Sequence, residues 1–370
     1  MGGGPDKEHL LITMWEPEPK HITAELKRRF PYFDITYIPV QRKERQLSDS
    51  GRDVPDELWN SATILITLAT LPSTPEKVPN LKLIHLLSAG VDHILNHPVL
   101  TSSTIPVTTS SGIHGPPITE WVTMTALIAS RHYWTEYEWQ KQRHWETDRK
   151  KLVSGTDWVG KTVGIAGYGS IGRQVARVFS ALGSSIHAYT ASPRDTPSAR
   201  ADHGYFLPGT GDPDGTIPSA WYSGTSKTAL HTFLASGLDM LVIALPLTPA
   251  TRGMFGTAEF EIVAHSSNKP RKGKGCFLVN IARGGLLDQS ALVKALNDET
   301  LLGAALDVTD PEPLPEDDPL WDAKNVIITP HVSALGSEYS ERAYDLFMTN
   351  WTRHEEGKKM FNLVDRRKGY

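Results

Sequence analysis

Short apolar runs alternate with segments of helical periodicity along most of the chain. Runs of a few Val, Ile and Leu residues are typical of buried strands, and helical segments between them indicate parallel sheets covered by helices. The runs form two series, so we predict two sheets and an α/β protein of two lobes. The first series is His9–Met14, Asp34–Val40, Ala62–Leu68, Leu81–Ser88 and Val107–Ser110. The second is Thr162–Ala166, Ser185–Tyr189, Asp239–Leu245, Cys276–Ile281, Leu301–Val308 and Asn325–Thr329.

Three stretches depart from this alternation. Pro117–Glu146, between the two series, has a helical pattern, and we interpret its aromatic stripe as packing in the core or against a second copy of the chain. Leu207–Gly224 combines Pro, Gly, Asp and Ser without periodicity, and His265–Gly275 is basic and rich in helix breakers. We predict that both are surface loops, which for the basic stretch is favoured over a phosphate site. The aromatic residues of the helical stretch are Trp121, Tyr133, Trp134, Tyr137, Trp139 and Trp145.

Composition narrows the class of protein. A length of 370 residues suggests two or three domains. The 38 Lys and Arg against 42 Asp and Glu leave a net charge of −4, which makes nucleic acid a poor candidate partner. The single cysteine, Cys276, fits a reducing compartment, and no apolar stretch is long enough to span a membrane. The start of the chain has no signal-peptide core, so we expect a cytoplasmic protein. We also expect no metal site.

A glycine motif stands at the start of the second series. Gly167-Tyr168-Gly169-Ser170-Ile171-Gly172 follows a predicted strand and precedes apolar residues spaced along one helix face, up to a stop at Gly183. Strand, glycine turn and helix in this order form the dinucleotide-binding turn, in which the helix N-terminus faces the pyrophosphate. We therefore expect these six residues to bind a nicotinamide dinucleotide.

The next strand bears on the choice of coenzyme. A carboxylate about 20 residues after the motif would bind the ribose of NAD. The expected position holds Thr190, Ser192 and Arg194 follow it, and no acid appears before Asp195. Hydroxyl groups and a cation suit a 2′-phosphate better than a bare ribose. NADP(H) is thus favoured, with NAD(H) still possible.

Three polar residues follow the ends of three predicted strands in the second series. They are Arg283, Glu312 and His331. Ligands of open parallel sheets bind beyond the carboxyl ends of the strands. Separate segments therefore bring a cation, a carboxylate and an imidazole to the edge where the dinucleotide is expected, which favours one common site over three unrelated surface residues.

The motifs around these residues resemble those of the D-isomer-specific 2-hydroxyacid dehydrogenases, and the ending Asn362–Tyr370 resembles the glyoxylate/hydroxypyruvate-reductase branch. The resemblance covers about Leu81 to the end, apart from Leu207–Gly224 and His265–Gly275. The matching stretches are Ser88–Asp92, the glycine motif, Leu245–Arg252, Val279–Gly285, Leu306–Pro313 and Thr329–His331.

The resemblance implies hydride transfer between nicotinamide and C2 of a 2-keto or 2-hydroxy acid. Arg283 would grip the substrate carboxylate and carbonyl, and His331 would be the general acid, with Glu312 stabilising its protonated form. Backbone N–H groups of Ala89 and Gly90 would also hold the carboxylate. Asp307 would bond the nicotinamide carboxamide. Further cofactor contacts are expected from Leu245, Pro246, Thr251, Ile281, Ala282 and Ser333.

The family's architecture implies a discontinuous substrate domain, residues 1–116 with 335–370, and a dinucleotide-binding Rossmann domain, residues 117–334. The lobes would be Rossmann-like or flavodoxin-like, with the active site in the cleft between them. The resemblance also implies a homodimer, which gives the aromatic stretch Pro117–Glu146 a partner to pack against.

Three other functions share this fold. A dinucleotide-sensing corepressor would bind NAD(P)H without turnover. A formate dehydrogenase would carry Gln in place of Glu312. A phosphoglycerate dehydrogenase usually prefers NAD and often carries a regulatory domain, which Thr190 and the short tail disfavour.

Overall fold

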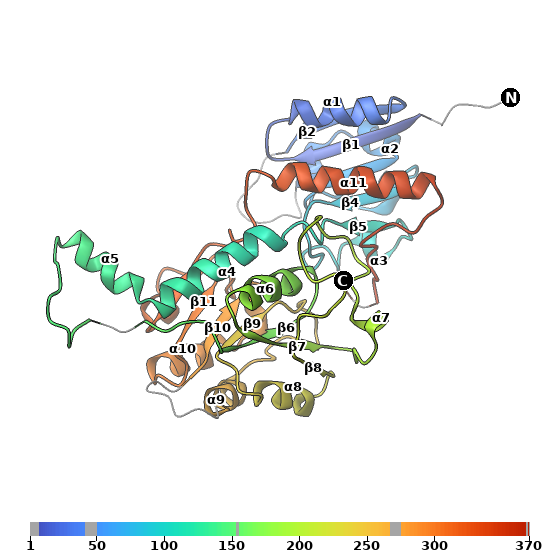
Figure 1. Ribbon diagram of the computed structural model, residues 1–370. Coiled ribbons are helices and arrows are strands. Elements are labelled where there is room, and N and C mark those ends of the chain that lie inside the picture. Colours follow the sequence, from blue (N-terminus) through green and yellow to red (C-terminus); the bar gives the residue numbers. More distant parts are fainter. Residues whose placement is uncertain (1–6, 41–49, 153–154, 267–274, 368, 370) are drawn as a thin grey trace. The chain divides into compact units, whose positions relative to one another are not determined.

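The computed structural model describes residues 7–40, 50–152, 155–266, 275–367 and 369. The chain forms two compact units. The first unit consists of Met1–Ile113 and Ser337–Tyr370, and the second consists of His114–Gly336. Each unit is built on one parallel sheet (Figure 1), so the predicted fold class is confirmed.

The sheet of the first unit has the strand order β2-β1-β3-β4-β5, which is the flavodoxin-like order. The helix α11, Tyr339–Glu355, returns to this unit from the C-terminal part of the chain. Its Trp351 packs edge-on against Phe33 of β2 at 5.5 Å between ring centroids, which ties the discontinuous segments together. The strands are β1 Glu8–Met14, β2 Phe33–Pro39, β3 Ile64–Thr67, β4 Leu83–Leu86 and β5 Val107–Thr109. The other helices are α1 Lys20–Arg29, α2 Asp56–Ser61 and α3 Pro98–Thr101.

The sheet of the second unit has the order β12-β11-β10-β9-β6-β7-β8. Counted from β6, this is the Rossmann order with one more strand, and the direction of winding switches between β6 and β9. The strands are β6 Thr162–Ala166, β7 Ser185–Thr190, β8 Ala220–Ser223, β9 Met240–Ile243, β10 Phe277–Asn280, β11 Gly303–Leu306 and β12 Val326–Ile328. The helices are α4 Gly115–Ser130, α5 Tyr133–Lys141, α6 Ser170–Ala181, α7 Pro197–Arg200, α8 Lys227–Leu234, α9 Thr257–His265 and α10 Gln289–Asn297.

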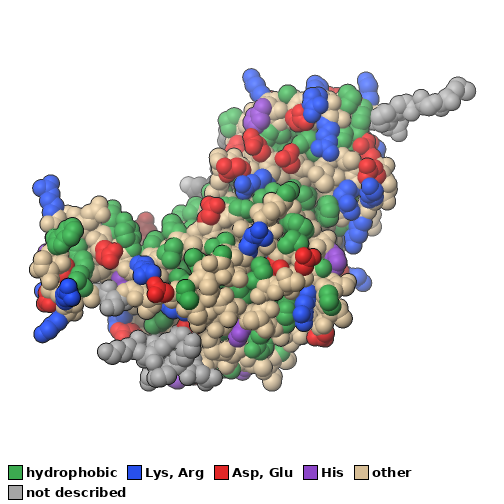
Figure 2. Space-filling model, viewed as in Figure 1, with side chains coloured by type: hydrophobic (Ala, Val, Ile, Leu, Met, Phe, Trp, Pro, Cys, Tyr) green, Lys and Arg blue, Asp and Glu red, His purple; other side chains and the backbone are tan. Residues whose placement is uncertain are grey.

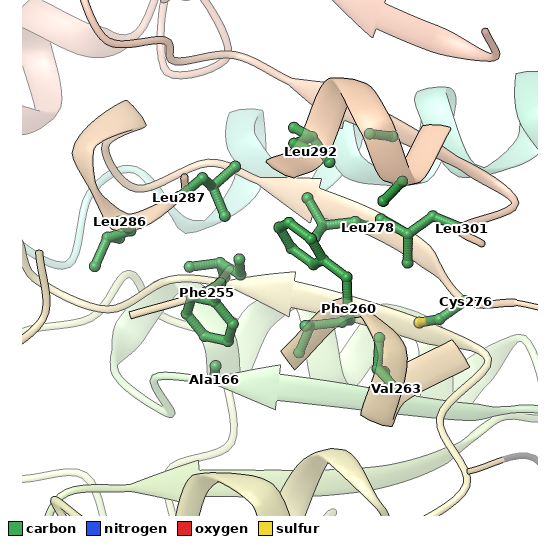
Figure 3. Close-up of a cluster of buried hydrophobic side chains, with 14 of the residues drawn as sticks. Ala166, Phe255, Phe260, Val263, Cys276, Leu278, Leu286, Leu287, Leu292 and Leu301 are labelled. Atoms are coloured by element: carbon green, nitrogen blue, oxygen red, sulfur yellow. The ribbon is translucent and has the colours of Figure 1, made fainter. Parts of the chain in front are cut away.

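Both faces of this sheet are covered. On one face Phe260 of α9 and Leu292 of α10 pack with Leu278 of β10, and all three are almost fully buried (Figure 3). On the other face α4 and α6 contribute Val122 and Phe179, which are completely buried. Apolar residues alternate between the faces of the central strands because each face has helices to pack against.

The prediction that Leu207–Gly224 is entirely a loop is wrong. Ala220–Ser223 forms β8, the edge strand that pairs in parallel with β7. All four of its residues are only half-buried, so no contrast between buried and exposed positions marks the strand in the sequence. Asp212, in the same stretch, is only 3% exposed, so this part is not a solvated surface loop either.

The long helix expected over Pro117–Glu146 is two helices, α4 and α5, and residues 142–146 are not helical. The chain turns at His132, whose φ of 56° interrupts the helical hydrogen bonds. Trp121 packs in the core as predicted, but Tyr133, Tyr137 and Trp145 are exposed, so the core interpretation is wrong for these three. Figure 2 shows hydrophobic side chains on the surface of the segment that carries α5, at the left of Figure 1. Packing against a second copy stays a prediction.

The other predicted loop, His265–Gly275, falls largely on residues 267–274, outside the described residues, and His265 is the last residue of α9. The first six residues lie outside them too. Within the described ranges, no helix is long and apolar enough to cross a membrane. The same residues contain no group of three or more His, Cys, Asp or Glu side chains arranged to hold a metal ion.

Candidate active site

The glycine motif forms the turn between β6 and α6. Gly167 has a φ of 103°, and a Cβ there would lie 2.4 Å from the carbonyl oxygen of Ala244. A Cβ at Gly172 would lie 2.2 Å from the carbonyl oxygen of Gly167, so helix and turn pack at a distance that only glycine permits. At Gly169 a Cβ would meet nothing within 4 Å, which leaves that backbone open to an approaching ligand. These three positions fit a bound dinucleotide in the way the motif requires.

Tyr168, the second residue of the motif, has a buried side chain that bonds to the protein, although a contact with the cofactor was expected. The Tyr168 side chain is 4% exposed, and its hydroxyl donates a hydrogen bond to Asp212 Oδ2 at 2.8 Å. Burial first, and the Asp212 carboxylate second, raise the pKa of Tyr168 above its ordinary value. The hydroxyl is therefore a permanent donor within the protein, and only the backbone of Tyr168 is left for the dinucleotide. Ser170 and Ile171, the first residues of α6, are half-buried.

The end of β7 lies beside this turn, since Gly167 N donates to Tyr189 O at 3.0 Å. Thr190 is 7% exposed and its hydroxyl donates to Ser192 O at 2.8 Å, while Ser192 itself is exposed. Arg194 donates from Nη1 to Ala199 O, and among the described residues its Nε is buried without a hydrogen-bond partner. The chain therefore places a cationic group with an unused donor close to the end of β7, and its contact with a 2′-phosphate stays a prediction.

Arg283 follows β10 and precedes a short 3-10 helix, Gly284–Leu286. The turn that carries it is held by Asn280, whose Oδ1 accepts from Ala282 N at 3.1 Å and whose Nδ2 donates to Arg283 O at 2.9 Å. The half-buried guanidinium donates from Nη1 to Ala282 O at 2.7 Å. A planar donor fork is thereby presented from a rigid turn at the carboxyl end of the sheet.

His331 and Glu312 lie in contact. His331 Nδ1 is 2.9 Å from Glu312 Oε2, and Glu312 Oε1 accepts from Thr309 N at 3.2 Å. Burial opposes the ionisation of Glu312, but the hydrogen bond and charge of His331, with help from Thr309 and the Arg283 charge, leave the pKa of Glu312 below its ordinary value. The carboxylate is therefore charged at neutral pH, and it orients the imidazole through Nδ1, which leaves Nε2 to exchange a proton with a ligand.

Asp307 holds the turn on which His331 stands. Its Oδ1 accepts from the Thr329 hydroxyl at 2.6 Å and from Val332 N at 2.8 Å, and its Oδ2 accepts from Ser333 N at 2.9 Å. These bonds keep His331 in the left-handed conformation, with a φ of 57°. A carboxylate has about four acceptor positions, so the predicted contact of Asp307 with the carboxamide is still open as a prediction.

The other residues expected to contact the cofactor also follow strands of this sheet. Leu245 and Pro246 come after β9, and Ile281 and Ala282 come directly after β10, with exposures of 7% and 8%. The Thr251 hydroxyl donates to Pro246 O at 2.7 Å, so it shapes the turn after β9. Ser333, beyond β12, is 6% exposed and bonded to Asp307.

The turn proposed to bind a carboxylate lies in the first unit, after β4. Ser88 Oγ donates to Gly90 O at 2.8 Å, and Ser110 N donates to Ser88 O at 2.9 Å. Tyr339, at the start of α11, donates its hydroxyl to Leu87 O at 2.7 Å. Ala89 is exposed and Gly90 half-buried at the centre of this braced turn.

Strand order and glycine turn define a dinucleotide-binding α/β protein. The comparison with known families identifies a narrower class. The chain belongs to the D-isomer specific 2-hydroxyacid dehydrogenases, whose NAD binding domain matches residues 123–207 and 215–333. The family resemblance read from the motifs is thereby confirmed, and with it the activity class: a nicotinamide-dependent oxidoreductase of small 2-keto and 2-hydroxy acids.

Similar proteins carry related names. The chain is 30% identical over 301 residues to a glyoxylate/hydroxypyruvate reductase A from Photorhabdus laumondii, covering 78% of this chain and 82% of that protein. It is 26% identical over 336 residues to a glycerate dehydrogenase from Methylorubrum extorquens, with 89% and 93% covered. A solved NADPH-dependent glyoxylate/hydroxypyruvate reductase from Sinorhizobium meliloti, in complex with NADP and sulfate, superposes with a TM-score of 0.73 at 26% identity, covering 98% of this chain and 100% of that one.

Proposed function

We propose that this protein reduces a small 2-keto acid, glyoxylate or hydroxypyruvate, to the D-2-hydroxy acid with NADPH. The observation that carries the proposal is the 2.9 Å contact of His331 with Glu312, at the carboxyl edge of the sheet that holds the dinucleotide turn and Arg283. An imidazole, its carboxylate partner and a guanidinium are the groups that polarise and protonate a ketone next to a carboxylate.

A bound dinucleotide would supply the hydride, and the side chains bind the substrate and stabilise the charge that develops on it. Arg283 binds the substrate carboxylate and the keto oxygen, where negative charge develops. In the first unit, the backbone N–H groups of Ala89 and Gly90 would donate to a substrate carboxylate. His331 delivers the proton from Nε2 to the keto oxygen, and the Glu312 carboxylate stabilises the imidazolium before that transfer. In the oxidation direction neutral His331 accepts the proton.

We also propose that NADPH is preferred over NADH. No carboxylate stands at the end of β7 to repel a 2′-phosphate, and Arg194 offers a buried donor without a partner among the described residues. The solved reductase from Sinorhizobium meliloti contains NADP. The first unit would bind mainly the substrate and the second unit the dinucleotide.

A homodimer is part of the proposal. Met124 and Leu127 of α4 and Tyr133 and Tyr137 of α5 are between 38% and 47% exposed, which makes an apolar strip that a second copy would cover. Light scattering of the purified protein measures the mass directly. A monomer at working concentration would contradict this part.

The test of function is turnover by the purified chain. Glyoxylate, hydroxypyruvate, pyruvate, phenylglyoxylate and 2-keto-isocaproate are each assayed with NADPH and with NADH, and the product is resolved on a chiral column. We expect a D-product, with glyoxylate or hydroxypyruvate and NADPH giving the highest kcat/KM. Tight NADPH binding without turnover of any of these acids would refute the proposal and favour a dinucleotide-sensing protein.

A further inference from the structure

A short loop interrupts the match to the family. Residues 208–214 lie between the two matched segments, and we call them the inserted loop. Asp212 is its buried anchor, and it reaches the dinucleotide turn directly through the Tyr168 hydroxyl at 2.8 Å. Asp212 Oδ1 also accepts from Thr216 N at 3.1 Å and Oδ2 from Ile217 N at 3.2 Å, so both carboxylate oxygens are bonded. The inserted loop is thus fixed to the glycine motif by a buried hydrogen bond.

A buried arginine of α6 completes the anchor. Arg173 is 3% exposed and donates from Nη1 to Asp212 O at 2.5 Å. Its guanidinium lies 5.1 Å from the centroid of the Tyr168 ring and 3.5 Å from an oxygen of Asp202. The buried Arg173 guanidinium is therefore satisfied by backbone carbonyl oxygens and by Asp202, and the buried Asp212 carboxylate by the Tyr168 hydroxyl and two backbone N–H groups. The sequence does not predict this network, because Tyr168 and Arg173 are 44 and 39 residues away from Asp212.

The same arginine joins the inserted loop to the segment that follows β7. Arg173 Nη2 donates to Arg200 O at 2.6 Å, and Arg200 Nε donates to Arg194 O at 2.8 Å. A continuous series of bonds therefore runs from Asp212 to the residue proposed to bind the 2′-phosphate.

The backbone of the loop packs on that segment as well. Asp202 N donates to Pro213 O at 2.7 Å. Gly215, the residue directly after the loop, has a φ of 66° and approaches the segment so closely that a Cβ there would lie 2.3 Å from Arg200 O. The segment 194–202 is consequently held by a side-chain network and by direct backbone packing, both of which depend on the path of the inserted loop.

We propose that the inserted loop, through Asp212 and Arg173, positions Arg194 and thereby sets the preference of the enzyme for a 2′-phosphorylated dinucleotide. The inference rests on the proposed preference for NADPH. Asp212, Arg173 and Tyr168 Oη are positioning groups here, since they act through the segment 194–200 and their bonds are to other protein groups. Loosening the network lets Arg194 leave the end of β7, which weakens the contact with the 2′-phosphate but not the contact with adenosine or pyrophosphate.

The experiment compares two probes on the full chain by calorimetry: 2′,5′-ADP, which carries the 2′-phosphate, and 5′-ADP, which lacks it. The variants are Tyr168→Phe, which removes one hydroxyl and keeps the ring, Asp212→Asn, and Arg194→Ala. Tyr222→Phe is the matched control, because this tyrosine lies on β8 with its ring against His187 and Phe233, away from the network. Circular dichroism establishes whether each variant is folded. If Asp212→Asn does not fold, Tyr168→Phe alone tests the positioning role.

We expect Arg194→Ala to weaken 2′,5′-ADP binding by about tenfold or more, the value of one charge-assisted bond. Tyr168→Phe and Asp212→Asn should weaken it about three- to tenfold, and none of these variants should change 5′-ADP binding by more than about twofold. Steady-state kinetics should show the same split, with a raised KM for NADPH and little change in kcat for Asp212→Asn.

The outcomes separate the two proposals. If Arg194→Ala leaves 2′,5′-ADP binding unchanged, the coenzyme assignment fails and this inference fails with it. If Arg194→Ala weakens it but Tyr168→Phe and Asp212→Asn do not, the coenzyme assignment stands and the positioning role is overturned. Equal losses for both nucleotides in the network variants would also overturn it, since the loop would then shape the adenosine site as a whole.

Discussion

Replacing Glu312 with glutamine tests the acid–base pair with the smallest change in shape. The carboxylate accepts from His331 Nδ1 at 2.9 Å, and an amide in its place keeps an oxygen acceptor but loses the charge. Reduction requires a proton on the imidazole, and the variant removes the negative charge that stabilises this cation, so kcat/KM for reduction should fall.

The size of this loss follows from the surroundings of the pair. Unit charges about 4 Å apart interact with about 1 kcal/mol in water and about 4 kcal/mol near a protein surface. The His331 and Glu312 side chains are 45% and 37% exposed, which places the effect at about 0.5–1 kcal/mol. At 1.36 kcal/mol per tenfold change, kcat/KM for reduction should fall by about two- to fivefold.

The assay follows NADPH absorbance from mildly acidic to alkaline pH at constant ionic strength. Glu316→Gln is the matched control, because Glu316 is an exposed carboxylate in the same loop region. A kcat/KM of Glu312→Gln equal to that of the wild type would refute the pairing, and an equal loss in Glu316→Gln would show a general charge effect instead.

A thermal readout checks the same pair without turnover. The pKa of Glu312 is lower in the folded protein than its ordinary value, so its ionised form stabilises the fold above the unfolded pKa of about 4.3. This contribution is lost as the pH falls through the lower, folded pKa. Glu312→Gln should therefore be less stable than the wild type at neutral pH by under about 1 kcal/mol, and the difference in Tm between the two should shrink in acid.

Three further predictions concern other parts of the site. Arg283→Ala should lower kcat/KM by about a hundredfold or more, with Arg283→Lys recovering only part because lysine lacks the planar fork; near-normal kinetics would contradict the assignment. Thr190→Asp combined with Arg194→Ala should narrow or invert the NADPH/NADH ratio of kcat/KM, and a wild type that prefers NADH would show that Arg194 does not bind the 2′-phosphate. Gly172→Ala should destabilise the fold by about 1–3 kcal/mol in denaturant unfolding, because the added Cβ would lie 2.2 Å from Gly167 O. Gly169→Ala, with open space around its Cβ, is the control for unfolding and should weaken only dinucleotide binding.

Much of the fold and of the site could be predicted from local sequence, for a physical reason. Buried parallel strands must be apolar on both faces, so β6, β9 and β10 stand out as continuous runs. The dinucleotide turn needs glycine at set intervals. Since parallel strands end at one edge, Arg283, Glu312 and His331 could be assigned to a common edge without knowledge of their contacts.

Other features depend on surroundings that the local pattern does not carry. The edge strand β8 is half-buried on both faces, so it has no periodicity to detect. The aromatic residues of α5 have the composition of a core helix, yet Tyr133 and Tyr137 are exposed because no element within the described residues covers them. Asp307 and Asp212 are two ordinary acidic residues in sequence.

The tertiary structure alone decides what those two carboxylates do. Each is buried, and a buried carboxylate must find donors wherever the fold brings them. Asp307 finds them 22 to 26 residues away, in the turn that presents His331. Asp212 finds the Tyr168 hydroxyl 44 residues away, in the dinucleotide turn. The sequence by itself determined which groups reach the active edge, because strand pattern and glycine spacing are local properties. The partners that hold those groups in place come from hydrogen bonding between distant segments, which only the folded chain brings together.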